Sequence, residues 1–126
     1  MKEIMAVIRL NMIGKTKTVL LENGFPALTC TKVMGRGKAK VDYSLVNAEL
    51  IEGNIEARVA EQLSEGHRLI PKRLITLTVV DSDVKKVVDA ITSANCTGNP
   101  GDGKIFVLPV DDAVRVRTGE TGDAAV

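Results

Sequence analysis

Aromatic residues are almost absent from this chain of 126 residues. Phe, Tyr and Trp together make up 2% of it, and Trp does not occur. The core must therefore be packed from aliphatic side chains, and the sequence offers no set of rings on which nucleic-acid bases would stack. An excess of charge is absent too, because 17 Lys and Arg face 16 Asp and Glu. This balance provides no basic surface, so we expect no nucleic-acid partner.

Cysteine and histidine are too few to indicate a metal or redox site. Cys30 and Cys96 lack the spacing of a zinc site or a redox pair, so we expect two small buried or half-buried residues in a reducing compartment. His67 is the only histidine, and we assign no metal-ligating or catalytic residue. The first 15 residues include Glu3 and no long apolar run. This argues against a signal peptide or membrane insertion and predicts a cytoplasmic protein.

The hydrophobic pattern predicts two strand-helix-strand units separated by a long middle segment. At 44% hydrophobic residues the chain can form one domain core. Apolar or alternating runs predict strands at 3–10, 27–35, 72–80 and 104–110, then a short alternating strand at 113–118 and a fraying tail. Helices are predicted at 14–24, closed by Asn23 and Gly24, and at 81–95, capped by Asp81 or Ser82.

This order is a doubled βαβ unit, so the predicted fold class is α+β. The arrangement is ferredoxin-like, with a four-stranded antiparallel sheet and both helices on one face. The stripe of Val84, Val87, Val88 and Ile91 is expected to pack on that face. The strand at 3–10 is apolar enough for burial on both sides, so we expect the chain to oligomerise with its sheets facing inward.

The middle segment, residues 41–70, is too long for an ordinary connection. Apolar residues recur at every fourth position between charged ones, which predicts a thin amphipathic helix weakened by Gly53. One interpretation is a surface loop with marginal helicity. The favoured one is a helix that binds a partner protein, because its apolar stripe must be covered. The candidate partner-binding residues are Ile51, Ile55, Arg58, Val59 and Leu63.

A glycine-rich loop precedes the strand at 104–110 and has the spacing of a phosphate-binding P-loop. Gly98, Gly103 and Lys104 supply the pattern G-x-x-x-x-G-K. A true P-loop follows a strand, opens a helix and has Ser or Thr after the Lys, whereas this loop follows a helix and continues into Ile105 and a strand. Walker-type hydrolysis is therefore not expected. Glycines that turn the backbone amides toward an anion, beside a lysine, still predict phosphate binding.

Two arginines follow this loop. Arg115 and Arg117 alternate along the predicted strand at 113–118, so both guanidinium groups should point the same way. One interpretation is a solvated strand face. Together with the glycine loop, and with Lys38 and Lys40 to complete a cationic pocket, a clamp for a phosphate-bearing ligand is favoured.

The stretch "TGNPGDGKIFVLPVDDAVRVRTGE" resembles the C-terminal signature of the P-II nitrogen regulatory family, and "MKEIMAVIRL", "GFPALT" and "GRGK" lie where that family has corresponding segments. The resemblance covers nearly the whole chain except about 41–70. It implies a homotrimer whose sheets form the inner wall, with ATP or ADP in each cleft between subunits. It also implies 2-oxoglutarate beside MgATP at the base of a long T-loop, whose state selects protein partners. The predicted organisation is a single P-II-like domain at 1–126, with the T-loop at about 37–71, a glycine-rich B-loop at about 96–104 and a C-terminal loop at about 113–126.

The family's binding residues carry over by position. The resemblance implies that nucleotide is bound by Thr29, Gly35, Gly37, Lys38, Thr78, Gly101, Asp102, Gly103, Lys104, Arg115 and Arg117, the two arginines coming from the adjoining chain. It assigns 2-oxoglutarate to Gly37, Lys40 and Lys72. Ala39 stands where the family has a Gln that helps to hold magnesium and 2-oxoglutarate. Magnesium is therefore a candidate cofactor without an assigned ligand.

Within the family, "GFPALT", "GRGK", "PKR" and the enlarged T-loop resemble the nitrogenase-linked NifI-type branch, and its longer-looped member in particular. This implies a second P-II-like protein as a companion and dinitrogenase as the target. We therefore expect a non-catalytic sensor of nitrogen status that regulates nitrogenase by protein–protein interaction. The alternatives are a regulator of an ammonium transporter or of an assimilation enzyme such as glutamine synthetase. An enzyme that hydrolyses nucleotides or acts on a small acid is the candidate from another class.

Overall fold

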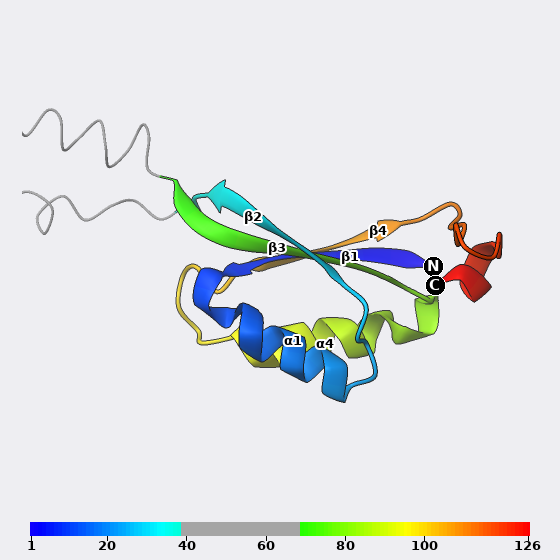
Figure 1. Ribbon diagram of the computed structural model, residues 1–126. Helices are drawn as coiled ribbons and strands as arrows, with labels where there is room; N and C mark the ends of the chain where they lie inside the picture. The colour runs from blue at the N-terminus through cyan, green and yellow to red at the C-terminus, as the bar shows by residue number, and fades with distance from the viewer. Residues whose placement is uncertain (39–68) are drawn as a thin grey trace, which may run out of the picture. The chain divides into compact units, whose positions relative to one another are not determined.

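The computed structural model describes residues 1–38 and 69–126 (Figure 1). The elements in order are β1 (Lys2–Arg9), α1 (Ile13–Glu22), β2 (Thr29–Gly35), β3 (Ile70–Val79), α4 (Val84–Asn95) and β4 (Lys104–Pro109). Short 3-10 turns occupy Leu10–Met12, Asp81–Asp83 and Gly122–Ala125. Each predicted strand of the double βαβ unit is present, with ends that differ by one or two residues from the predicted ones.

The chain divides into two compact units. Met1–Val33 and Pro71–Val126 form the first, and Met34–Ile70 form the second, which overlaps the predicted T-loop. Of the second unit, only residues 34–38 and 69–70 are described. The predictions for Lys40, and for the partner-binding set of Ile51, Ile55, Arg58, Val59 and Leu63, lie outside the described residues.

The sheet has the strand order β2-β3-β1-β4, with β1 in its centre. β1 is antiparallel to β3, from Lys2 opposite Val79 to Arg9 opposite Lys72, and antiparallel to β4 on its other side. Helices α1 and α4 lie on the same face of the sheet (Figure 1). This confirms the predicted ferredoxin-like fold with a four-stranded antiparallel sheet.

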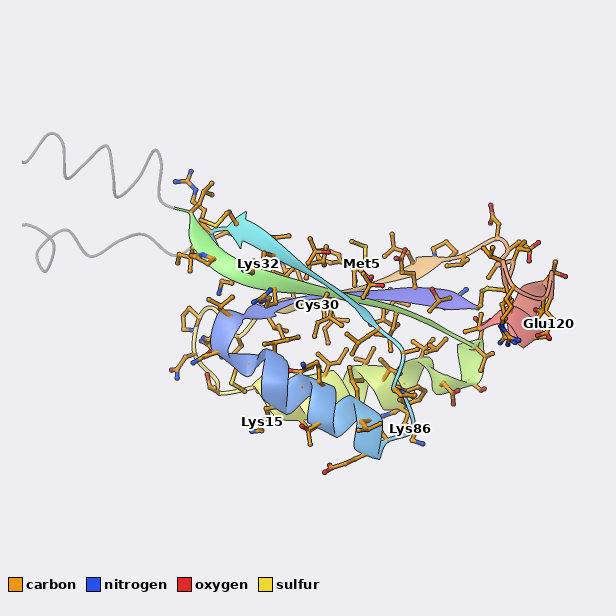
Figure 2. The ribbon with its side chains drawn as sticks, viewed as in Figure 1. Met5, Lys15, Cys30, Lys32, Lys86 and Glu120 are labelled. Atoms are coloured by element: carbon orange, nitrogen blue, oxygen red, sulfur yellow. The ribbon has the colours of Figure 1, made fainter. Side chains whose placement is uncertain are left out.

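The core lies between the sheet and the two helices. Ile4, Ala6 and Ile8 of β1 point into it and are at most 1% exposed. The helices cover only one face of this strand, and burial of its other face by further copies of the chain stays a prediction. Met5 lies on the face away from the helices (Figure 2). On that face Phe106 of β4, opposite Met5 in the ladder, is 49% exposed.

The helix ends agree only partly with the sequence signals. Gly24 adopts φ +90° after α1, and the amide of Phe25 donates to the Leu20 carbonyl at 2.9 Å, as expected of a glycine-closed helix. Neither Asp81 nor Ser82 caps α4, because the 3-10 turn Asp81–Asp83 precedes it. The chain enters the helix in a tighter turn, so no side chain reaches the first helical amides.

Both cysteines also differ from expectation. Cys30 and Cys96 are free and exposed, whereas buried or half-buried residues were predicted. Cys30 lies on β2, whose residues are mostly exposed, and Cys96 follows the last residue of α4. Position at the edge of the fold, which composition cannot reveal, decides their exposure.

The end of α4 is fixed by a buried polar contact with α1. Asn95 is 5% exposed, and its Nδ2 donates to Thr16 Oγ1 and to the Ile91 carbonyl, each at 2.9 Å. The Thr16 hydroxyl in turn donates to the Met12 carbonyl at 2.7 Å. A buried hydrogen bond of this kind specifies geometry, since an unpaired Nδ2 donor would be costly. Asn95 Oδ1 is buried without a partner among the described residues, so the contact of α4 with α1 rests on Nδ2 alone.

Candidate functional site

The B-loop, residues 96–104, turns sharply between α4 and β4. Gly98, Gly101 and Gly103 have φ of +80°, +95° and +124°, a region that other residues rarely adopt. The prediction that these glycines let the backbone turn tightly is confirmed.

Gly103 is also required by a close approach. A Cβ atom built on it would lie 2.1 Å from the carbonyl oxygen of Val7, a main-chain atom that has no room to move. Nothing lies within 4 Å of a Cβ atom built on Gly98. The loop therefore ends in close contact with the backbone of β1, whereas there is open space beside Gly98.

The carboxylate of Asp102 organises the loop from within. It accepts hydrogen bonds from the amides of Thr97 at 2.7 Å and Gly98 at 3.0 Å, and from the Thr97 hydroxyl. Arg9 of β1 adds an ion pair at 2.6 Å from Nη1. The Thr97 hydroxyl, followed by the Thr97 amide and Arg9, holds the pKa of Asp102 well below its usual range. The Gly98 amide, which was expected to face a ligand, thus binds the loop's own anion together with the Thr97 amide.

Arg9 and Lys72 hold the loop from the sheet, and their role was not found from the sequence. Arg9 Nη2 donates to the Pro100 carbonyl at 3.1 Å, and Lys72 Nζ donates to the Gly101 carbonyl at 3.3 Å. These two cations are direct partners in the β1–β3 ladder. In the sequence, the only signal for Arg9 is that a cation ends the apolar run "EIMAVIR". Its contact with the B-loop becomes visible only in the folded chain.

Lys104 is the first residue of β4 and is exposed. Its ladder partner is Val7, so both side chains lie on the face of the sheet away from the helices. Lys104 is therefore a third cation beside the loop, after Arg9 and Lys72, and it is directed to the open face.

The C-terminal loop is not the strand that was predicted at 113–118. Residues 113–122 form a hairpin, closed by a single bridge between Val114 and Thr121 and by the Gly119 amide on the Arg115 carbonyl at 2.7 Å. The tail after it does not fray. It forms a 3-10 turn, and Asp123 lies 3.9 Å from the amino group of Met1. The expectation failed because the glycines at 119 and 122, with φ of +74° and +67°, bend the alternating run back on itself.

The hairpin gives the two arginines different surroundings. Arg115 Nη1 forms an ion pair with Glu120 at 2.9 Å, and Nη2 donates to the Ala124 carbonyl at 3.2 Å. Arg117 lies in the turn of the hairpin and is exposed; within residues 1–38 and 69–126 it has no hydrogen bond or ion pair. The premise that both arginines alternate on one strand is therefore wrong.

The predicted nucleotide residues fall into two groups within one chain. Thr78 of β3 is opposite Glu3, at the end of β1 far from Arg9. At about 3.3 Å per residue, this places Thr78 roughly 20 Å from the ladder pair that holds the B-loop. The C-terminal segment belongs to the Thr78 end, since Val126 and Thr78 line the same cavity of about 330 Å³. Figure 1 shows the B-loop and the C-terminal turn at opposite ends of the sheet.

The remaining predicted residues lie elsewhere on β2 and after it. Thr29 begins β2 and is exposed, and Gly35 ends it. Gly37 and Lys38 are exposed and belong to the second compact unit, and nothing lies within 4 Å of a Cβ built on Gly35 or Gly37. Their roles, like those of the other carried-over residues, stay predictions.

Among the described residues, no group of three or more His, Cys, Asp or Glu side chains could hold a metal ion. None of the helices in that part of the chain has the length and apolar character needed to cross a bilayer.

Comparison with known proteins identifies the family. The sequence matches the family described as Nitrogen regulatory protein P-II over residues 1–120. The chain belongs to the P-II family. It is 48% identical over 128 residues to "Nitrogen fixation nifHD region GlnB-like protein 2" of Methanothermococcus thermolithotrophicus, covering 100% of this chain and 98% of the relative. The namesake from Methanothermobacter marburgensis is 45% identical over 126 residues, covering 100% of both.

A haloarchaeal relative is more distant. "Nitrogen regulatory protein GlnK2" of Haloferax mediterranei is 38% identical over 125 residues, covering 99% of this chain and 90% of the relative. The resemblance read from the signature, including its leaning toward the nitrogen-fixation branch, is confirmed. The B-loop of this P-II protein and residues 113–120 of its C-terminal hairpin fall within the matched residues.

The close approach at Gly103 predicts different effects for two glycine substitutions. Gly98→Ala should cost about 1–2 kcal/mol, the penalty of a left-handed conformation at a position with open space. Gly103→Ala should destabilise clearly more, because β1 or β4 must shift to relieve the contact with Val7. Urea unfolding at one fixed protein concentration measures both. Equal losses for the two variants would contradict the described packing.

The lowered pKa of Asp102 predicts an acid-dependent contribution of the loop. Because the folded pKa lies below the unfolded value of about 3.9, the contribution is present above that pH and is lost as the pH falls through the folded pKa. Asp102→Asn should therefore be less stable than the parent at pH 7, and the difference should narrow below about pH 4. Urea midpoints between pH 7 and pH 2.5 measure this. Thr97→Ala, which removes a donor, should reproduce part of the loss at pH 7. A gap that is unchanged at pH 3 would refute the role.

Proposed function

We propose that this P-II protein is a nitrogen-status signalling protein. It binds ATP or ADP and 2-oxoglutarate, and it regulates nitrogenase by protein–protein contact through its T-loop. The observation that carries the nucleotide part is the separation of the two groups of predicted residues. The B-loop lies at one end of the sheet, and Thr78 with the C-terminal hairpin lies at the other. Such a site is complete only where the B-loop of one copy meets the hairpin of the next.

The open face of the sheet supports the homotrimer that this arrangement needs. Phe106 and Leu108 of β4 are 49% and 37% exposed, and they lie beside Met5 and Glu3 on the face that no helix covers. Large apolar side chains exposed on an uncovered sheet face are typical of an interface. Packing the sheets of three copies against one another would cover these side chains and form three seams.

The chemistry of the two half-sites suits a nucleotide's phosphates. Lys104 supplies a point charge beside a tight glycine bend, and Arg117 supplies a guanidinium group without a partner among the described residues. Thr29 and Thr78 would contact the adenosine. Asp102 already orders the B-loop in the free protein, so the loop would lose little conformational entropy when nucleotide binds.

The pairing of Arg9 with Lys72 supports an acid ligand next to the B-loop. Two cations opposite each other on neighbouring strands suit a dicarboxylate such as 2-oxoglutarate. Lys72 would exchange its contact with the Gly101 carbonyl for a carboxylate. Gly37 and Lys40, from the T-loop base, would complete the site. Magnesium is proposed only as a companion of ATP, since Ala39 replaces the family's Gln and the described residues contain no ligand set.

The names of the relatives support the proposed target. Two of them are called nifHD region GlnB-like protein 2, and nitrogen fixation is part of both names. We assign this chain the same setting, with dinitrogenase as partner, a second P-II-like protein as companion and the cytoplasm as location. The protein acts as a regulator without catalysis, because effectors shift its T-loop between states that they bind unequally.

Calorimetry with ATP, ADP and 2-oxoglutarate tests ligand binding. The parent should bind ATP and ADP, and Lys104→Ala or Arg117→Ala should each weaken ATP at least about tenfold, because a charge-assisted hydrogen bond is lost. Lys85→Ala, an exposed lysine on α4 paired with Asp89, is the control and should change nothing. Sedimentation should show a trimer. A monomer at micromolar concentration would refute the shared site. So would an ATP affinity that neither Lys104→Ala nor Arg117→Ala changes.

Capture from nitrogen-fixing cells tests the target. The tagged chain, with its companion protein, should retain dinitrogenase without 2-oxoglutarate and release it when ATP and 2-oxoglutarate are added together. An ammonium transporter or glutamine synthetase recovered in place of dinitrogenase would support the alternative functions and contradict this one.

A further inference from the structure

Arg115 is held on both arms of its guanidinium group by the hairpin that carries it. Nη1 forms the ion pair with Glu120 Oε2 at 2.9 Å, and Nη2 donates to the Ala124 carbonyl at 3.2 Å. Arg117, two residues on, has no partner among residues 1–38 and 69–126. The two arginines of the predicted phosphate clamp therefore differ before any ligand binds. Only Arg115 must lose its ion pair with Glu120 in order to bind a phosphate.

We propose that Glu120 is an affinity-determining residue of the nucleotide site, because its carboxylate competes with the nucleotide's phosphates for Arg115. The inference rests on the proposed nucleotide-binding function and assigns a role to a residue outside the predicted site. In the free protein Glu120 occupies the position on the guanidinium group that a phosphate oxygen takes in the complex.

The exposure of the pair makes this exchange feasible. The side chains of Arg115 and Glu120 are 38% and 45% exposed, so an incoming anion reaches the guanidinium group without unfolding the hairpin. An exposed ion pair contributes little free energy. A polyphosphate carries more negative charge than one carboxylate and offers several acceptor oxygens to the same donors. The polyphosphate therefore displaces Glu120 from Arg115, whereas a ligand without phosphate lacks the charge and the acceptor oxygens to do so.

The tether gives Glu120 an advantage over free carboxylates. Glu120 lies five residues from Arg115 in the same hairpin, so its effective concentration at the guanidinium group is high. Small monocarboxylates from solution are therefore excluded from Arg115. The pair acts as a filter that admits di- and triphosphates to this arm of the clamp.

The hairpin does not depend on the Glu120 side chain for its shape. The Arg115 amide donates to the Glu120 carbonyl at 2.8 Å, the Gly119 amide to the Arg115 carbonyl at 2.7 Å, and the Gly122 amide to the Ala113 carbonyl at 3.0 Å. A glutamine at position 120 keeps these backbone bonds and nearly the same volume. It removes the charge alone and leaves Arg115 in place to meet a phosphate.

Glu120→Gln in the full-length protein tests the inference by calorimetry with ATP, ADP and adenosine. The variant should bind ATP and ADP about two- to fivefold more tightly than the parent, which is the range that an exposed ion pair accounts for. Adenosine should bind both proteins with equal affinity, because it has no phosphate that competes with Glu120 for Arg115. Circular dichroism and sedimentation confirm that the variant keeps the parent's fold and assembly.

Asp89→Asn is the matched control. It removes the same charge and breaks an exposed ion pair with Lys85 on α4, so it separates competition at Arg115 from a change in net charge. It should leave all three affinities unchanged. A Glu120→Gln variant that binds ATP as weakly as the parent, or more weakly, overturns the role of Glu120 while nucleotide binding itself stands. A parent that binds no nucleotide overturns both proposals.

Discussion

The geometry of the candidate site depends on one anion, the half-buried carboxylate of Asp102. It draws the amides of Thr97 and Gly98 inward, and it receives Arg9 from the central strand. A loop rich in glycine loses much conformational freedom on ordering, and a charged acceptor with four donors is an effective way to offset that loss. Without this contact the three positive-φ glycines would permit many loop shapes. With it, the loop has one shape and one position against β1.

The same contact links the loop to two strands of the sheet. Arg9 and Lys72 are ladder partners, and Lys72 stands one residue after Pro71, where the first compact unit resumes. Lys72 Nζ also donates to the Gly101 carbonyl, so the B-loop is held by both β1 and β3 at this end of the sheet.

The sequence alone was enough for the fold and for the family, and less so for the site. Strong periodicity, such as the stripe that includes Val87 and Ile91, predicts helices well, because those residues pack on the sheet. The alternation in "AVRVRT" misled, because two glycines after it close a hairpin instead of extending a strand. Arg9 was missed for another reason. Its role follows from a register that joins residues 93 positions apart, and no local pattern encodes such a contact.

The placement of the B-loop and the C-terminal hairpin at opposite ends of one sheet has a consequence for assemblies of unlike subunits. If each seam takes its loop from one chain and its hairpin from the next, a ring built from two different P-II chains would contain seams of more than one composition. Nucleotide affinity in such a ring would belong to ordered pairs of neighbours and not to either chain. Subunit exchange alone, with no change in sequence or modification, would then alter how the assembly responds to the cell's adenylate pool.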